Sequence, residues 1–154
     1  MEMNNPCLFC TNRAEAKDYV GSRSYWHMII NRNQNYLGKT MLVLKRHEID
    51  VTALTTNEQI EFWQLLAHIR EALAILFQPD HFNYTFLMNQ DPHVHLHLIP
   101  RYKTFREFAG LKFTDGHFGE HYQLTENIVP IEVRQKLAEE LRTLIPNLIL
   151  ERQE

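Results

Sequence analysis

The sequence lacks the features that define several classes of protein. Its 154 residues include only two cysteines, five glycines and six prolines, which excludes a disulfide framework, a collagen-like repeat and a low-complexity chain. No apolar run approaches the roughly 20 residues that span a bilayer, so we expect no membrane partner. With 44% hydrophobic and 23% charged residues, the composition predicts one globular domain over residues 1–154.

A strong charge of one sign is also missing. Sixteen basic and nineteen acidic residues give a net charge of −3, so we expect no nucleic-acid partner. Residues 1–6 have neither the basic start nor the apolar stretch of a signal peptide. These observations predict a cytoplasmic protein. What the sequence has in excess is histidine, with nine in total and three of them within five positions.

Two antiparallel hairpins are predicted by short runs of β-forming residues. A polar loop that ends in Gly38 separates the first two runs, and the tight polar turn 89–92 joins the last two. The four runs cover residues 25–31, 39–44, 82–88 and 93–99.

Two helices are predicted by apolar residues at helical intervals. Thr55 and Glu58 have the spacing of a capping box, and the pattern after them indicates a long helix that ends before Pro79. A second helix is expected between Pro130 and Pro146. Residues 101–124 show no sustained period and are expected to form an irregular loop. The order of the elements favours an antiparallel α+β domain, with its core at about residues 7–108 and a loop and helix in residues 109–154.

The run from His93 to Ile99 alternates imidazole and aliphatic side chains. A strand would place His93, His95 and His97 on one face, with neighbouring backbone positions roughly 6.5–7 Å apart. Imidazoles at that spacing can converge on one phosphate group or one metal ion. Two other interpretations stay open: an amphipathic strand whose polar residues are histidine, or a mononuclear metal site with Asp91 as a further ligand.

This alternating run, which ends in two apolar residues, resembles the signature of the histidine triad (HIT) family of nucleotide hydrolases and transferases. The segment 28–47 resembles the nucleoside-binding hairpin of the family, and residues 99–102 resemble the segment that follows the triad in many bacterial members. The resemblance implies a homodimer whose chains each hold an antiparallel sheet of about five strands, one long central helix and a C-terminal helix.

The resemblance also implies a covalent mechanism at the α-phosphate of a nucleotide. His95 would be the nucleophile and His97 would donate a hydrogen bond to the phosphate. The expected substrates are dinucleoside polyphosphates, such as diadenosine tetraphosphate, or nucleoside phosphoramidates. The alternatives are a nucleotidyltransferase or phosphorylase that uses the same intermediate, and a nucleotide-binding module with little turnover.

Four residues are predicted to bind the substrate. Asn31 matches the position that binds the ribose hydroxyls in the family, and Asn89 or Gln90 matches an amide on the phosphates or leaving group. The turn that carries these amides is predicted to be shorter than in typical family hydrolases. Arg101 belongs to a local basic group that would either meet polyphosphate or form a solvated surface.

Both cysteines occur as Cys7-Leu8-Phe9-Cys10. Alone, this C-x-x-C pair indicates half a zinc site, a redox pair or two ordinary thiols. A redox motif usually follows a strand, and nothing strand-like precedes Cys7. A subset of bacterial HIT proteins resembles this arrangement, which implies that His47 and His93 complete a structural Zn²⁺ site with the two cysteines.

Overall fold

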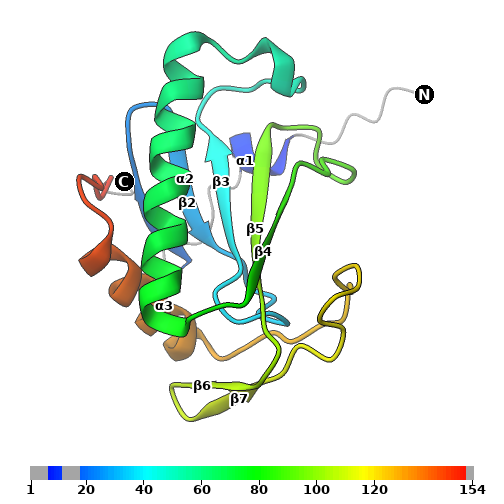
Figure 1. Cartoon of the computed structure of the whole chain (residues 1–154). Helices are drawn as coiled ribbons and strands as arrows, with labels where there is room; N and C mark the ends of the chain where they lie inside the picture. Colours follow the sequence, from blue (N-terminus) through cyan, green and yellow to red (C-terminus); the bar gives the residue numbers. More distant parts are fainter. Residues whose placement is uncertain (1–6, 12–17, 152–154) are drawn as a thin grey trace.

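A computed structural model describes residues 7–11 and 18–151. Its centre is an antiparallel sheet of five strands in the order β1-β2-β3-β5-β4 (Figure 1). This architecture confirms the predicted α+β fold. The strands are β1 (Tyr19–Ser22), β2 (Trp26–Ile30), β3 (Thr40–Leu44), β4 (His81–Thr85) and β5 (His95–Arg101).

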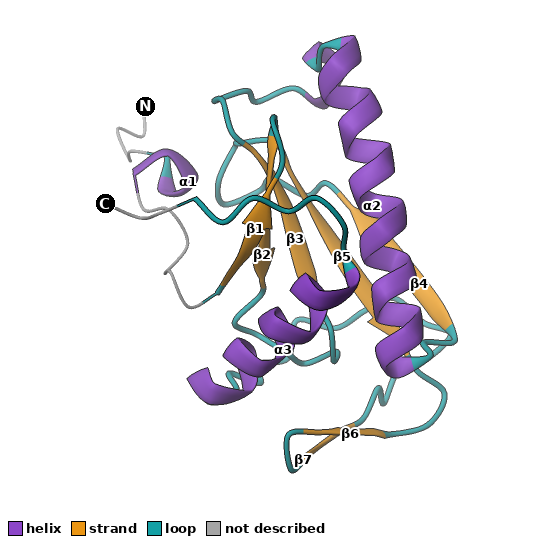
Figure 2. Cartoon of the chain, turned by 90° about the vertical axis from the view of Figure 1, so that its left-hand side faces the viewer, coloured by secondary structure: helices purple, strands orange, loops and turns teal. Residues whose placement is uncertain are grey.

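Helices lie on both sides of this sheet. The long α2 (Thr56–Phe77) and the C-terminal α3 (Ile131–Leu144) contact each other and cover one face, whereas the short α1 (Leu8–Thr11) lies on the other side (Figure 2). A 3₁₀ turn (Val51–Ala53) precedes α2.

The capping box predicted for the start of α2 is present. The Thr55 hydroxyl accepts a hydrogen bond from the Glu58 amide, and the Glu58 carboxylate accepts one from the Thr55 amide. The helix ends at Gln78, which takes a left-handed conformation with φ of 49° just before Pro79. Both helices therefore form where the sequence predicts them.

The pairing of β3 with β5 decides where the histidines point. His95 lies opposite Val43 and His97 opposite Met41. Because side chains alternate along a strand, Leu96 and Leu98 face the helices and are buried in the core. The two histidines consequently lie on the face that carries α1.

Gly38 closes the turn between β2 and β3 with φ of 86°. A side chain at this position would bring its Cβ within 2.8 Å of Leu73 Cδ2. Glycine is therefore required both for the left-handed backbone and for the close approach of the turn to α2.

Some sequence predictions were wrong in their details. No strand was predicted for β1. The region 101–124, expected to be irregular, contains the hairpin of β6 (Arg106–Phe108) and β7 (Leu111–Phe113). Its turn residues Ala109 and Gly110 have φ of 50° and 77°. This is the pattern of a type I′ turn, which normally begins with Asn, Asp or Gly.

The connection between β4 and β5 is longer than the predicted four-residue turn 89–92. It runs from Phe86 to Val94, because β4 ends at Thr85 and β5 begins at His95. Within the described residues, no helix is long and apolar enough to cross a membrane.

Candidate active site and metal cluster

A pocket of about 950 Å³ lies on the α1 side of the sheet. Its walls come from α1, β2, β3, the connection after β4 and the start of β5. This volume is in the usual range for small-molecule sites. Both His95 and His97 line the pocket, as do the predicted substrate-binding residues Asn31, Asn89 and Gln90.

The ring of His95 is fixed by its own strand. Its Nδ1 lies 2.6 Å from the backbone oxygen of His93. A carbonyl can only accept, so Nδ1 carries the proton and Nε2 keeps a free lone pair. Burial lowers the pKa of His95, an effect that the Asp91 carboxylate opposes. The arrangement provides an unprotonated, oriented imidazole nitrogen.

The ring of His97 packs against that of His95, with 5.0 Å between the centroids and 73° between the planes. Burial, reinforced by the nearby His95 and Lys39, lowers the pKa of His97 to about 4. Its Nδ1 is buried and has no hydrogen-bond partner among the described residues. A neutral imidazole with an unpaired nitrogen is suited to bond a ligand.

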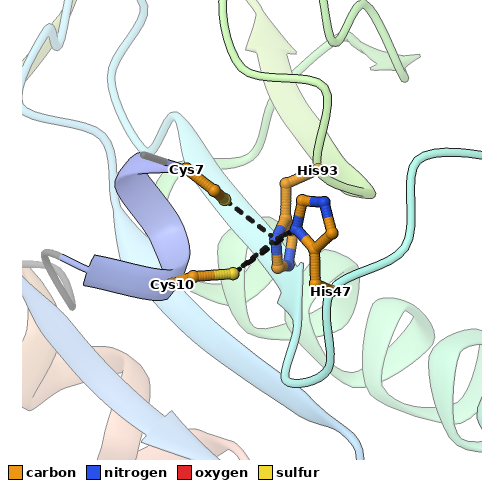
Figure 3. A group of neighbouring side chains, drawn as sticks. All are labelled: Cys7, Cys10, His47 and His93. Atoms are coloured by element: carbon orange, nitrogen blue, oxygen red, sulfur yellow. Dashed lines mark hydrogen bonds between the residues drawn. The ribbon is translucent and has the colours of Figure 1, made fainter. Parts of the chain in front are cut away.

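His93 lies just before β5, which begins at His95, although the sequence predicts it as part of the strand. Its amide donates to the Asp91 carbonyl at 2.8 Å in a turn. Its imidazole lies on the α1 side, as those of His95 and His97 do, and is beside Cys7, Cys10 and His47 (Figure 3).

These four side chains form a compact cluster. The Nδ1 atom of His93 lies 3.3 Å from Cys7 Sγ, 3.5 Å from Cys10 Sγ and 3.3 Å from His47 Nδ1. Cys10 Sγ lies 3.4 Å from His47 Nδ1. Tetrahedral Zn²⁺, with bonds of about 2.3 Å to sulfur and 2.0 Å to nitrogen, separates its ligand atoms by about 3.3–3.8 Å. The donor set therefore fits zinc in both chemistry and spacing.

A hydrogen bond to the backbone sets the His93 tautomer that metal binding requires. Its Nε2 lies 2.7 Å from the carbonyl oxygen of Leu44, so Nε2 carries the proton and Nδ1 is left as the bare nitrogen that a metal requires. Among the described residues, these four are the one such group of His, Cys, Asp and Glu that could hold a metal ion. His95 and His97 are outside it, which disfavours a metal site on the histidine strand.

Comparison with known proteins identifies the family. The sequence profile of the HIT domain matches residues 13–104. The chain belongs to the HIT domain family. Members of this family are nucleotide hydrolases or transferases. Among curated proteins, no match to this sequence was found.

Solved structures of HIT proteins share the fold. A histidine triad protein from Bradyrhizobium japonicum matches with a TM-score of 0.65 at 19% identity, covering 84% of this chain and 92% of that one. A Zn-bound histidine triad family protein from Mycobacterium smegmatis matches with 0.63 at 17%, covering 90% and 92%. A diadenosine triphosphate hydrolase from Plasmodium falciparum matches with 0.60 at 17%, covering 84% and 77%.

One predicted substrate residue of this HIT domain lies elsewhere. Arg101 ends β5, about 20 Å along the strand from His95, and it does not line the pocket. Its buried guanidinium forms an ion pair with Asp115 at 2.7 Å and donates to Asn83 at 2.9 Å. It also donates to the carbonyl oxygens of His117 and Glu120. Arg101 thus fastens the 115–120 segment to the sheet.

Sequence reasoning missed other pocket residues of the HIT domain. Asp18 and Arg32 line the pocket as an ion pair of 3.0 Å, and the buried Asp18 carboxylate also binds Arg134 of α3. Leu124 reaches the rim from a distant segment. No local spacing marks these residues. Phe9 also lines the pocket and was also missed, although its place between the two cysteines could have indicated that it lies near the site.

Proposed function

We propose that the protein cleaves a nucleotide derivative at its α-phosphate through a nucleotidyl group carried by His95. The observation that supports this most is the bond from His95 Nδ1 to the His93 carbonyl, because it leaves Nε2 free to attack in a pocket of suitable volume. Membership of the HIT family supports the same chemistry.

The proposed reaction has two steps. In the first, His95 Nε2 forms a bond to the α-phosphorus while the bond from phosphorus to the leaving group breaks. In the second, water attacks the phosphorus, the P–Nε2 bond breaks and the nucleoside monophosphate departs. Over the cycle, water supplies the oxygen to the phosphate and a proton to the leaving group. His97 would hold a phosphate oxygen by a hydrogen bond.

Asn31 and the amides of the β4–β5 connection would orient the nucleotide. The Asn31 Oδ1 accepts from the Asn33 amide at 2.9 Å, so Asn31 would offer its Nδ2 to the ribose hydroxyls. Asn89 and Gln90 are exposed and line the pocket, where they would bind phosphate oxygens or the leaving group.

Charge around the pocket favours one of the expected substrate classes. Among the described residues, the lining holds one basic side chain, Arg32, which forms an ion pair with Asp18, and a second acid, Asp91. A dinucleoside polyphosphate carries a negative charge on every phosphate, and these residues would leave it uncompensated. We therefore infer that nucleoside phosphoramidates are better substrates than dinucleoside polyphosphates.

Apolar residues at the rim support this inference. Leu8, Leu87 and Leu124 line the pocket although they are 59%, 44% and 84% exposed. Exposed apolar side chains grouped at a pocket mark a binding surface for an apolar group. An uncharged amine leaving group with an apolar body would cover them.

We also propose that Cys7, Cys10, His47 and His93 hold a structural Zn²⁺. Bound zinc would keep both thiols ionised and fasten the N-terminal turn to the sheet. All four ligand positions would be taken by protein, so zinc would have no open position for substrate.

The test compares an adenosine 5′-phosphoramidate that carries an apolar amine with diadenosine tetraphosphate, for the wild type and for His95→Ala. We expect kcat/KM to be at least tenfold higher for the phosphoramidate, and His95→Ala to lower it by about 10³-fold. The opposite substrate preference would refute the charge argument. Near-normal turnover by His95→Ala would refute the covalent mechanism.

A further inference from the structure

Phe9 connects the two sites. It lies in α1 between the cysteines, and its ring centroid is 4.8 Å from that of His95 and 5.5 Å from that of His93, with the planes tilted by 49° and 54°. The half-buried side chain also lines the pocket. A residue of the cysteine turn thus touches the proposed nucleophile directly.

Within the described residues, α1 is attached to the loops beside β3 and β5. The attachments are the contacts of Cys7 and Cys10 with His93, the contact of Cys10 with His47, and the hydrogen bond from the Phe9 amide to Asp91 Oδ2 at 3.3 Å. A helix of four residues has too few internal hydrogen bonds to be stable alone. The cluster in Figure 3 therefore determines where Phe9 lies.

Among the described residues, the His95 ring has one hydrogen bond, and this bond holds only the Nδ1 edge of the ring. The bond from Nδ1 to the His93 carbonyl fixes that nitrogen, but rotation of an imidazole about its Cβ–Cγ bond has a broad energy profile. The Phe9 ring contacts the His95 ring and restricts this rotation. The His97 ring also packs against the His95 ring. Nε2 must stay aimed at the phosphorus for attack.

We propose that Phe9 is a positioning residue for His95, and that occupancy of the Cys7, Cys10, His47 and His93 cluster controls this positioning. The inference rests on the proposed function for its catalytic consequence. The contact itself is independent of that function. Metal at the cluster would then affect the rate without contacting the substrate.

The test uses Phe9→Ala, the rescue variant Phe9→Tyr, and Phe105→Ala as the control that removes an exposed aromatic ring far from the pocket. The first measurement is the NMR shift of the His95 ring protons, assigned by their loss in His95→Ala. We expect Phe9→Ala to move these signals, because the ring current of Phe9 is lost, and Phe9→Tyr and Phe105→Ala to leave them near the wild-type position.

The second measurement is hydrolysis of the phosphoramidate. Phe9→Ala should lower kcat by about three- to tenfold, the size of one aromatic contact, with KM changed less than twofold. Phe9→Tyr should restore kcat. Removal of metal from the wild type with a chelator should shift the His95 signals toward those of Phe9→Ala, and should have little further effect on that variant.

The outcomes separate this inference from the proposed function. If the wild type hydrolyses no nucleotide, the proposed function fails, while the NMR shifts still report on the contact. Unmoved His95 signals in Phe9→Ala would overturn the positioning role, as would a rise in KM alone, which would make Phe9 a wall for the substrate. Unmoved signals after chelation would overturn control by the cluster.

Discussion

The half-buried imidazole of His97 predicts a specific loss of stability in acid. Its pKa is lowered to about 4 in the folded protein, against about 6.5 in an unfolded chain. Below pH 6.5 the unfolded chain takes up a proton that the folded protein refuses, so the free energy of unfolding falls with pH. Between pH 7.5 and pH 5 this single group accounts for a loss of about 2 kcal/mol.

Urea unfolding of the wild type and His97→Asn at these two pH values tests the prediction. The substitution removes the titrating group, so the wild type should lose about 2 kcal/mol more than the variant on acidification. His81→Asn, which removes an exposed imidazole from β4, should behave like the wild type. Equal losses in the wild type and His97→Asn would refute the claim that His97 is held neutral by burial.

Three further predictions concern the turn at Gly38, the cysteine and histidine cluster, and the ion pair of Arg101 with Asp115. Gly38→Ala should lower the free energy of unfolding by about 2 kcal/mol in urea titrations, because the new Cβ meets Leu73 in a left-handed turn; an unchanged midpoint would contradict this. Metal analysis should show that Cys7→Ser and His47→Ala lose zinc while His95→Ala keeps it, whereas zinc loss from His95→Ala would favour a metal site on the histidine strand. Asp115→Asn should cost about 3 kcal/mol of stability by breaking its buried pair with Arg101, with kcat/KM within about twofold of the wild type; a large fall in kcat/KM would return Arg101 to the substrate site.

The parts of the fold that depend on local patterns were predictable. For α2, the capping box of Thr55 and Glu58 and the apolar repeat after it were enough to predict the helix, because both signals come from residues close together in the sequence. The β6–β7 hairpin was not predictable in this way, because its turn places Ala109 at positive φ. β1 was missed as well, since a strand of four residues carries little periodic signal.

The site was predictable where neighbours in sequence are neighbours in space. Alternation along β5 put His95 and His97 on one face, and the structure brings both to the pocket. The predicted strand also included His93, but β5 begins only at His95, and the turn at Asp91 precedes it. The role of Arg101 could not be read from the sequence, because its partner Asp115 comes from a separate segment.

Isolation of the proposed intermediate would show directly whether His95 is the nucleophile. Wild type mixed with a nucleoside phosphoramidate is quenched within one turnover in alkaline denaturant, which preserves acid-labile P–N bonds, and its peptides are analysed by mass spectrometry. We expect the nucleotidyl group on the peptide that contains His95, and its absence in His95→Ala. A label on another residue, or turnover with no label at any quench time, would contradict nucleophilic attack by His95.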